Sequence, residues 1–369
     1  MNLRGLAAAM ATAGALPLAL GGPADAGDRA PVWQITLHSA QHNDAVPLAL
    51  PSDDTWRRLA PRGGRNLAYQ DDELRWSRRQ AGWTWSLLAR NHATLVASQP
   101  ALALAALVAN GRRPASDTSW QADVHLRAFA GAGLAIGHSQ ALAPGWSVHG
   151  EAQVLALSRW RARDLDGPVR YSTATGQYDF GLQSQELDNR LVFPFRQDFA
   201  HRGAGLLLAG GLDWQGSSFW ARAAVRDGGW LRWRGVPQQQ AALDTATEAL
   251  DAEGFLLYKP LVTGRNGQAG AQRWLPWRSQ VAVGATLASG QRLGLQLDTL
   301  PGFGVLPALL WQRPATVAGG LALGADWQMH ERRLTLSSAW QGVSLRVGAD
   351  RLGSAAQSRL LALGYSHTF

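Results

Sequence analysis

The feature that most constrains the fold is a set of long segments in which apolar and polar side chains alternate with a period of two. In Trp83–Ala97 one face carries mainly Trp, Leu and Ala side chains, and the other carries Thr, Ser, Arg and His side chains. The same alternation runs through 120–138 and 146–161. Because successive side chains of a β-strand point to opposite sides, this pattern predicts an antiparallel sheet with one apolar face and one polar face.

The length and composition of these segments favour a membrane barrel over a soluble sandwich. They reach about ten residues or more, as a membrane-crossing strand requires, whereas strands of soluble sheets usually have five or six. The apolar face is rich in Ala, Leu and Gly, which fits a face that contacts lipid instead of a packed core. Tryptophans near the segment ends fit aromatic girdles: Trp83, Trp120, Trp146, Trp160, Trp214, Trp233 and Trp340.

Counted from the C-terminus, the pattern predicts an all-β, antiparallel up-and-down barrel of about fourteen strands, with twelve or sixteen as alternatives. The expected strands are 358–369, 343–351, 333–341, 317–329, 303–312, 291–300, 277–289, 217–234, 203–215, 169–185, 146–161, 120–138, 82–97 and 67–80. Val32–His38 is a candidate for one extra strand.

The last strand of the chain carries a family resemblance. Its residues Arg359 to Phe369 alternate bulky side chains with small or polar ones and finish on a phenylalanine, although His367 stands where that pattern usually has an apolar residue. This resembles the closing strand of Gram-negative outer-membrane β-barrel proteins, whose terminal aromatic is an assembly signal. The resemblance implies outer-membrane location, contact with outer-membrane lipid and lipopolysaccharide, and recognition by the barrel-assembly machinery.

The N-terminal segment agrees with export. Residues 1–26 have one early charge, an apolar stretch and an Ala24-Asp25-Ala26 cleavage site, which predicts a signal peptide. Residues 27–66 are turn-rich and are expected to form a periplasmic tail or a plug, so the barrel is expected to span 67–369. The chain has no cysteine, which excludes disulfides.

Charge and hydropathy exclude other classes. No segment after residue 26 has the roughly 18 consecutive apolar residues of a membrane helix. The formal charge is +8, but the arginines are dispersed along strands, so nucleic acid is not expected as a partner. No cofactor is implied, and the nine histidines lack the spacing of a helical metal site, so neither a cofactor nor a metal is expected.

The direction of the last strand orients the connections. If that strand ends in the periplasm, the turns at Gln341-Gly342, Ser289-Gly290 and Gln215-Gly216 lie on that side, and the long 235–276 connection lies outside. Pro100–Ala109 is expected to be a short capped helix in a periplasmic connection, and this 98–119 connection is a candidate docking site for a periplasmic partner. Gln238–Glu253 has helical composition and is also expected to be a helix.

If the apolar faces contact lipid, as at Leu126, Val154 and Leu323, the polar faces line the lumen. The inward arginines expected to meet solutes are Arg90, Arg127, Arg159, Arg161, Arg222, Arg226, Arg232 and Arg234. Hairpin register is expected to pair some inward charges across neighbouring strands: Glu73 with Arg90, Asp71 with His92, Asp123 with Arg161, and His125 with Arg159. The plainer interpretation of these pairs is that they satisfy charge in a narrow lumen.

The resulting hypothesis is an outer-membrane channel for small solutes. Because arginine exceeds carboxylate on the inward faces, the channel is expected to prefer anions, and substrate specificity is an open alternative. An outer-membrane enzyme of the lipid hydrolase or protease type is the rival, with Ser147, His149, His330 and Glu331 near expected strand ends. A structural or secretion-accessory barrel is the third class. A lumen filled by paired charges would favour the enzyme or the scaffold, and a continuous polar bore would favour the channel.

Overall fold

The computed structural model describes residues 30–49, 57–193, 203–246, 248–250, 256–258, 260–315 and 320–368. The expected signal peptide and the terminal Phe369 lie outside these ranges, so the signal peptide and the role of Phe369 as an assembly signal stay predictions. Within the described ranges, no helix has the length and apolar character needed to span a bilayer.

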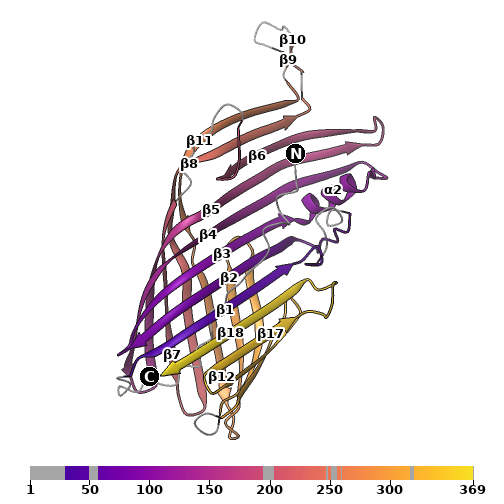
Figure 1. The fold of residues 1–369 in the computed structure, drawn as a ribbon. Coiled ribbons are helices and arrows are strands. Elements are labelled where there is room, and N and C mark those ends of the chain that lie inside the picture. Colours follow the sequence, from indigo (N-terminus) through magenta and orange to yellow (C-terminus); the bar gives the residue numbers. More distant parts are fainter. Residues whose placement is uncertain are drawn as a thin grey trace.

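The strands close on themselves as an antiparallel barrel (Figure 1). β1 (Val32–Asn43) pairs with β18 (Ser358–Thr368) on one side and with β2 (Arg65–Gln80) on the other. Pairing then continues around the wall in chain order, with β6 and β7 sharing one position and β11 and β12 sharing another. The predicted fold class, a fourteen-stranded barrel, is therefore confirmed.

The other elements, in chain order, are β3 (Trp83–Ser98), α2 (Gln99–Ala109), β4 (Thr118–Ala143), β5 (Trp146–Ser172), β6 (Gln177–Asp188), β7 (Gly203–Gln215), β8 (Phe219–Asp244), β9 (Glu248–Leu250), β10 (Leu256–Tyr258), β11 (Val262–Leu275), β12 (Arg278–Thr286), β13 (Arg292–Leu300), β14 (Gly304–Arg313), β15 (Ala322–Gln328), β16 (Arg333–Trp340) and β17 (Val343–Ala349).

Two wall positions hold an interrupted strand. β6 and β7 run in the same direction between β5 and β8, with β6 against the later part of β5 and β7 against its earlier part. β11 and β12 in the same way follow one edge of β8 in succession. Each pair therefore counts once in the circumference of the barrel.

The predicted number of strands was right, but the set of strands that make up this number was wrong in two places. The expected strand 169–185 does not exist as a unit, because its first residues end β5 and its last belong to β6 after a turn at 173–176. Val32–His38, considered only as an extra strand, lies within β1, which closes the barrel. The barrel therefore begins at Val32 and not at residue 67, and residues 32–43 are neither a tail nor a plug.

These two errors reverse the direction of the strands between them. We call the end of the barrel where β18 finishes the C-terminal end, and the opposite end the loop end. The short turns at Gln341-Gly342, Ser289-Gly290 and Gly216 lie at the C-terminal end as predicted, and Gly342 adopts a φ of 82° that suits a two-residue hairpin. The connection that holds α2, expected at this same end, lies instead at the loop end (Figure 1).

α2 itself forms as predicted. Ser98 caps it by accepting a hydrogen bond from the backbone N–H of Ala101, and Pro100 stands in its first turn, where a missing N–H costs nothing. Its Leu104 packs with Trp120 and Val169 of the neighbouring strands. The second expected helix, Gln238–Glu253, is wrong, because β8 continues to Asp244 and Glu248–Leu250 form the short strand β9.

The strands differ greatly in length, which makes the barrel lopsided. β4, β5 and β8 have 26, 27 and 26 residues, whereas β15, β16 and β17 have 7, 8 and 7. The long strands rise beyond the short ones at the loop end (Figure 1). We call this part, formed by the ends of β4, β5, β6, β8 and β11, the extension.

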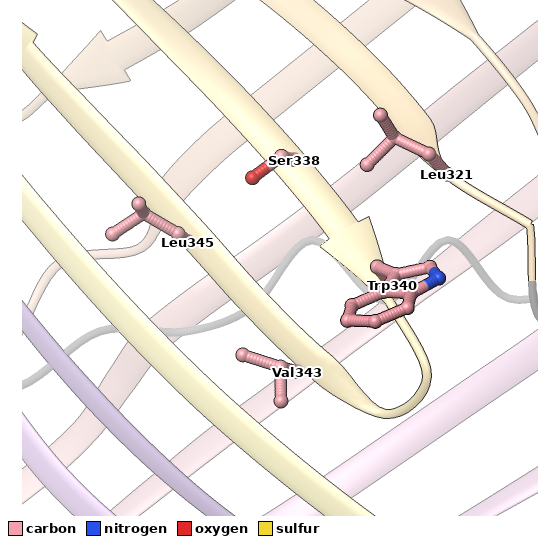
Figure 2. Close-up of a pocket in the computed structure, with 5 residues that line it drawn as sticks. All are labelled: Leu321, Ser338, Trp340, Val343 and Leu345. Atoms are coloured by element: carbon pink, nitrogen blue, oxygen red, sulfur yellow. The ribbon is translucent and has the colours of Figure 1, made fainter.

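Below the extension the outer wall is an exposed apolar band. Val154 and Leu323 point outward and are exposed, as expected for lipid contact, whereas Leu126 is buried. A shallow groove in this band is lined by Leu321, Ser338, Trp340, Val343 and Leu345 (Figure 2). Such a surface is unfavourable in water and suits hydrocarbon.

The expected tryptophan girdles are only partly right. Trp83, Trp146 and Trp340 are exposed on the outer wall near the C-terminal end, with Trp214 beside Trp146. The other three are buried: Trp120 with α2, and Trp160 and Trp233 in a cluster inside the barrel.

Candidate functional site

β-Bulges decide which side chains of the long strands face the lumen, and two of them affect arginines that were predicted to line it. In β5, Ala130 of β4 stands opposite Arg159 while Gly131 stands opposite Leu157, so Ser158 is an extra residue. In β8, the register against β7 shifts near Asp227, which has a φ of 64°. A one-residue bulge turns every following side chain to the other face.

The prediction that eight arginines line the lumen is wrong for four of them, because the bulges turn these four to the outer face. After Ser158, Arg159 and Arg161 lie on the outer face, where they pair with Asp188 and Glu186. After Asp227, Arg232 and Arg234 are exposed on the outer face, while Leu231 and Trp233, which alternate with them, are buried inside the barrel.

The other four arginines lie on the inward face. Arg90 is at the middle of the lumen, and Arg226 lies at the edge of the same region. Arg222 pairs with Asp213 of the adjacent strand nearer the C-terminal end. Arg127 pairs with Asp164 in the extension.

A cluster of charged side chains fills the lumen at mid-height. They come from β2, β3, β5, β8 and β12, so the cluster spans about half of the circumference. We call the following residues the central charge cluster: Asp71, Glu73, Arg75, Arg90, Glu151, Arg226, Asp227 and Arg278.

Four ion pairs of the cluster join strands that are not neighbours, and the longest of them is Arg226 of β8 with Asp71 of β2 at 4.0 Å. Arg75 of β2 reaches Glu151 of β5 at 2.6 Å, and Arg90 of β3 reaches Asp227 of β8 at 2.7 Å. Arg278 of β12 reaches the Asp71 carboxylate of β2 at 2.9 Å. β12 lies six positions from β2 one way around the wall and eight the other way, so this last pair bridges the lumen from side to side.

Burial and charge balance characterise the cluster. Arg90 is 5% exposed, Asp71 is 6% exposed and Glu73 is 3% exposed, so little water reaches them. The cluster holds four carboxylates and four guanidinium groups. Buried charges are tolerated when each has partners, and here Arg90 contacts both Glu73, at 3.2 Å, and Asp227. The lumen at this height therefore holds a network of paired and mostly buried charges.

Apolar side chains occupy the lumen beside the charges. They form a separate apolar cluster that consists of Leu88, Phe129, Ala135, Leu155, Leu157, Trp160, Leu207, Leu231, Trp233, Val236 and Ala271. The expectation that polar faces alone line the lumen is therefore wrong on the side formed by β3 to β8.

Two of the four predicted charge pairs have the predicted register. Glu73 stands opposite Arg90 and Asp71 opposite His92, with His92 Nδ1 3.5 Å from Asp71.

The other two predicted pairs are wrong. His125 stands opposite Asp164, and Asp123 stands opposite Asp166. The register differs because β4 and β5 stay paired up to Ala143 and Trp146, where a 139–145 loop was expected, and the bulge at Ser158 adds one more residue to the shift. His125 instead lies 2.8 Å from Asp123 and 2.6 Å from Asp164, in the exposed part of the extension.

Sequence reasoning missed Asp227 and Arg278, although both are central. The segment Asp227-Gly228-Gly229 carried a signal, because Asp tolerates the left-handed conformation and two glycines permit an irregular backbone. Arg278 follows Pro276, which interrupts the strand between β11 and β12.

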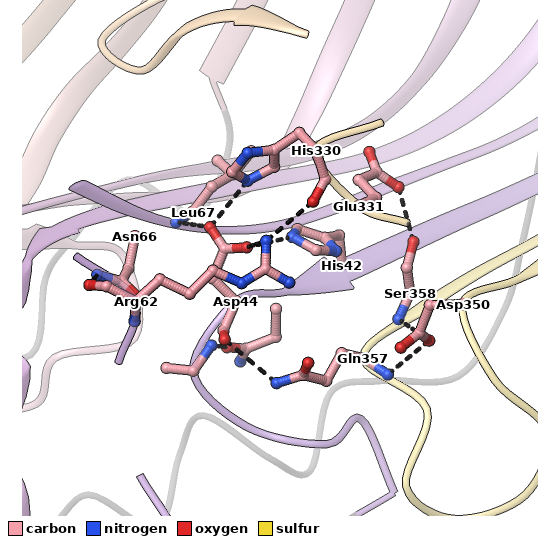
Figure 3. Close-up of polar contacts among 12 residues, drawn as sticks. His42, Asp44, Arg62, Asn66, Leu67, His330, Glu331, Asp350, Gln357 and Ser358 are labelled. Carbon is pink, nitrogen blue, oxygen red and sulfur yellow. Dashed lines mark hydrogen bonds and ion pairs between the residues drawn. The ribbon is translucent and has the colours of Figure 1, made fainter. Parts of the chain in front are cut away.

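A second polar cluster lies at the loop end, on the connection from β1 to β2 (Figure 3). The buried carboxylate of Asp44 accepts hydrogen bonds from the backbone N–H of Leu67 at 2.8 Å, and from His42 at 2.9 Å and His330 at 3.0 Å. Arg62 adds an ion pair at 2.7 Å. We call His42, Asp44, Arg62 and His330 the rim cluster.

The rim cluster contains three side chains of the kind that ligate metal ions. Ligand atoms of His42, Asp44 and His330 lie within 4.8 Å of one another. Both oxygens of Asp44 already have donors, however, and the guanidinium of Arg62 supplies the positive charge next to it. The geometry is that of an anchor which joins the β1–β2 connection to the turn between β15 and β16.

Replacing Asp44 with alanine is expected to release this anchor. The donors of Arg62, His42 and Leu67 would lose their acceptor, at a cost of about 3 kcal/mol. Hydrogen–deuterium exchange should then be faster in 57–66 than in the wild-type protein, and unchanged in β17. Equal exchange in both proteins would show that Asp44 does not hold the segment.

The pH dependence of the anchor follows from the same contacts. Burial alone would raise the pKa of Asp44, but hydrogen bonds from His330, His42 and the Leu67 N–H outweigh it and hold the pKa well below its usual range. A lowered pKa means that the stabilisation is complete above the ordinary carboxyl pKa of about 4 and is lost as pH falls through the lowered value. Exchange in 57–66, corrected for the intrinsic rate, should stay constant from pH 7 to about pH 4. Loosening already at pH 6 would contradict this.

The residues considered for catalysis do not form a catalytic group. Ser147 and His149 lie at the C-terminal end and not at the outer rim, and His149 Nδ1 lies 3.6 Å from Asp213. Within the described ranges, no hydrogen bond joins Ser147 to His149. His330 belongs to the rim cluster, and Glu331 is buried with hydrogen bonds from Tyr69 and Ser358.

No protein-family model matches this chain, and no curated protein matches it. Among solved structures it is similar to a TodX deltaS2S3 mutant monoaromatic hydrocarbon channel, with 10% identity, coverage of 92% of this chain and 91% of that chain, and a TM-score of 0.45. It is also similar to the P. putida toluene transporter TodX, with 8% identity, 92% and 90% coverage and a TM-score of 0.44. The outer membrane protease OmpT from Escherichia coli shows 8% identity, 93% and 98% coverage and a TM-score of 0.25. The fold assignment rests on the strand pairing described above.

Proposed function

We propose that this chain is an outer-membrane barrel that passes small polar solutes through a lumen gated at mid-height by the central charge cluster. The closed wall and the outward apolar band support placement in a membrane. The observation that carries the gate is the set of ion pairs between strands that are not neighbours, above all Arg278 with Asp71.

Polar side chains on both sides of the closure support passage. Toward the C-terminal end, His149 and Arg222 face the lumen and are partly exposed. Toward the loop end, His125 and Asp164 are partly exposed in the extension. The charge cluster thus separates two wetted regions of the same interior.

Opening the gate requires ion pairs to exchange partners. Arg90 already contacts three carboxylates and Arg278 contacts Asp71 and Asp227, so each guanidinium has a second partner within reach. A solute that offers its own hydrogen-bond donors and acceptors can replace these contacts one at a time. This keeps the cost of opening below that of exposing unpaired buried charges.

The predicted anion preference loses its main basis, because four of its arginines face outward and the closure is charge-balanced. In a salt gradient, single channels of the wild-type protein are therefore expected to show a reversal potential near zero. A strongly anion-selective wild-type channel would contradict the balanced closure.

The proposal is tested by planar-bilayer recording and by swelling of proteoliposomes in solutes of graded size. We expect rare, brief openings of the wild-type barrel and slow swelling with the smallest polar solutes. Liposomes that contain the heat-denatured protein are the control. If neither the wild-type protein nor variants of the central charge cluster conduct, passage through the lumen is excluded.

A scaffold is the second candidate, and the network of paired charges in the lumen is the observation that favours it. A scaffold needs no opening, so its lumen should stay closed under every condition. The same recordings separate the two candidates, because only a gated passage becomes conductive when its closing pairs are removed.

A further inference from the structure

The outer face of the wall changes from apolar to basic at one height. One row across four adjacent strands consists of paired residues that are all exposed and apolar: Val154, Leu206, Trp230 and Trp274. The next row toward the loop end contains Arg232 of β8, and Arg234 follows it on the same face. Both arginines are exposed.

The two tryptophans mark this row as the edge of the band. Trp230 and Trp274 are side by side, with ring centroids 4.3 Å apart. Tryptophan is enriched where hydrocarbon meets headgroups, because its ring is apolar and its N–H is polar. Arg232 and Arg234 therefore stand at headgroup height on the loop-end side of the membrane.

Strand β5, which is separated from β8 by β6 and β7, carries outward arginines that do pair with carboxylates. Arg159 and Arg161, also turned outward by a bulge, pair with Asp188 and Glu186 of β6. Arg232 and Arg234 have no ion pair with any residue in the described part of the chain. Their outward charge is thus available to an anion outside the protein.

We propose that Arg232 and Arg234 bind phosphate groups of a phosphorylated lipid in the outer leaflet, with its acyl chains against the apolar row below. Side chains two residues apart on a strand lie about 7 Å apart on one face, so both guanidinium groups can reach one headgroup. Guanidinium binds phosphate through two parallel hydrogen bonds. This inference depends on the membrane placement in the proposed function, but not on passage through the lumen.

The test measures binding of bisphosphorylated lipid A, and of the same lipid after removal of its phosphates, to the full-length barrel in detergent by native mass spectrometry. The variant is R232Q/R234Q. The matched control is Arg313→Gln, which removes an exposed outward arginine at the C-terminal end of β14. Heat-modifiable migration on gels shows that each variant is folded.

We expect the double variant to bind the phosphorylated lipid at least tenfold more weakly, and the Arg313 variant to bind it like the wild-type protein. The dephosphorylated lipid should bind weakly to all three. Inorganic phosphate in equal amount should not displace the lipid, because it lacks the acyl chains. Unchanged affinity in the double variant, equal affinity for both lipids, or displacement by equimolar phosphate would each overturn the proposal. Conductance of the double variant, measured separately, should equal that of the wild-type protein.

Discussion

Replacing both Arg90 and Arg278 with glutamine is expected to convert a rarely open barrel into a conducting, cation-selective one. The two arginines make the contacts to Asp227 and Asp71 that join strands which are not neighbours in the wall. Without them the cluster keeps four carboxylates but only two guanidinium groups. Water must then enter to solvate the unpaired carboxylates, because buried unpaired charge is strongly unfavourable. Single-channel recording should show conductance several-fold above wild type and a reversal potential of the cation-selective sign.

The mirror variant gives this expectation its control. Asp71→Asn with Asp227→Asn leaves four guanidinium groups with two carboxylates, so it should conduct with the opposite selectivity. Arg222→Gln removes an inward arginine whose partner, Asp213, is on the adjacent strand, and should leave conductance at the wild-type level. The account is wrong if the two double variants have the same selectivity, or if the Arg222 variant conducts as they do.

Replacing Trp233 with alanine is expected to destabilise the barrel far more than the same change at Trp230. Trp233 is 1% exposed and packs inside the barrel, whereas Trp230 is 45% exposed on the outer wall. Truncation of a buried tryptophan costs about 3–5 kcal/mol, since the surrounding side chains fill the cavity only partly. Lipid can move into the space left at Trp230, so the loss there should be less than half as large.

Urea unfolding in lipid vesicles, followed by gel migration, measures both losses under one condition. The two variants remove the same side chain from positions three residues apart on β8, so strand propensity is matched. Equal losses would mean that Trp233 does not face a packed interior, and that the assignment of faces after the bulge in β8 is wrong.

The sequence predicted what depends on regular alternation. The period of two identified the strands, and the tight turn at Ala81-Gly82 set the register that places Glu73 opposite Arg90. The outward band followed from the same rule, as Val154 shows. These features depend only on residues close together in the chain, so they can be predicted from a single sequence.

The sequence did not predict what depends on interruptions of the alternation. The bulges at Ser158 and Asp227 each exchange the two faces of a strand, and they moved Arg159 and Arg232 from the predicted lumen to the outer wall. Contacts across the lumen also could not be predicted, because they join strands far apart in the chain. Arg278 with Asp71 is the clearest example.

The most direct test of the closed lumen is to link its two sides chemically. Because the chain contains no cysteine, Asp71→Cys with Arg278→Cys provides a unique pair of thiols. A short bis-maleimide should join them in the folded barrel, and cleavage between β2 and β12 should then leave both fragments in one band on a denaturing gel. The account predicts efficient linkage that is lost after unfolding. If the folded barrel reacts at both thiols but does not become linked, β2 and β12 do not meet across the lumen, and the proposed gate does not exist.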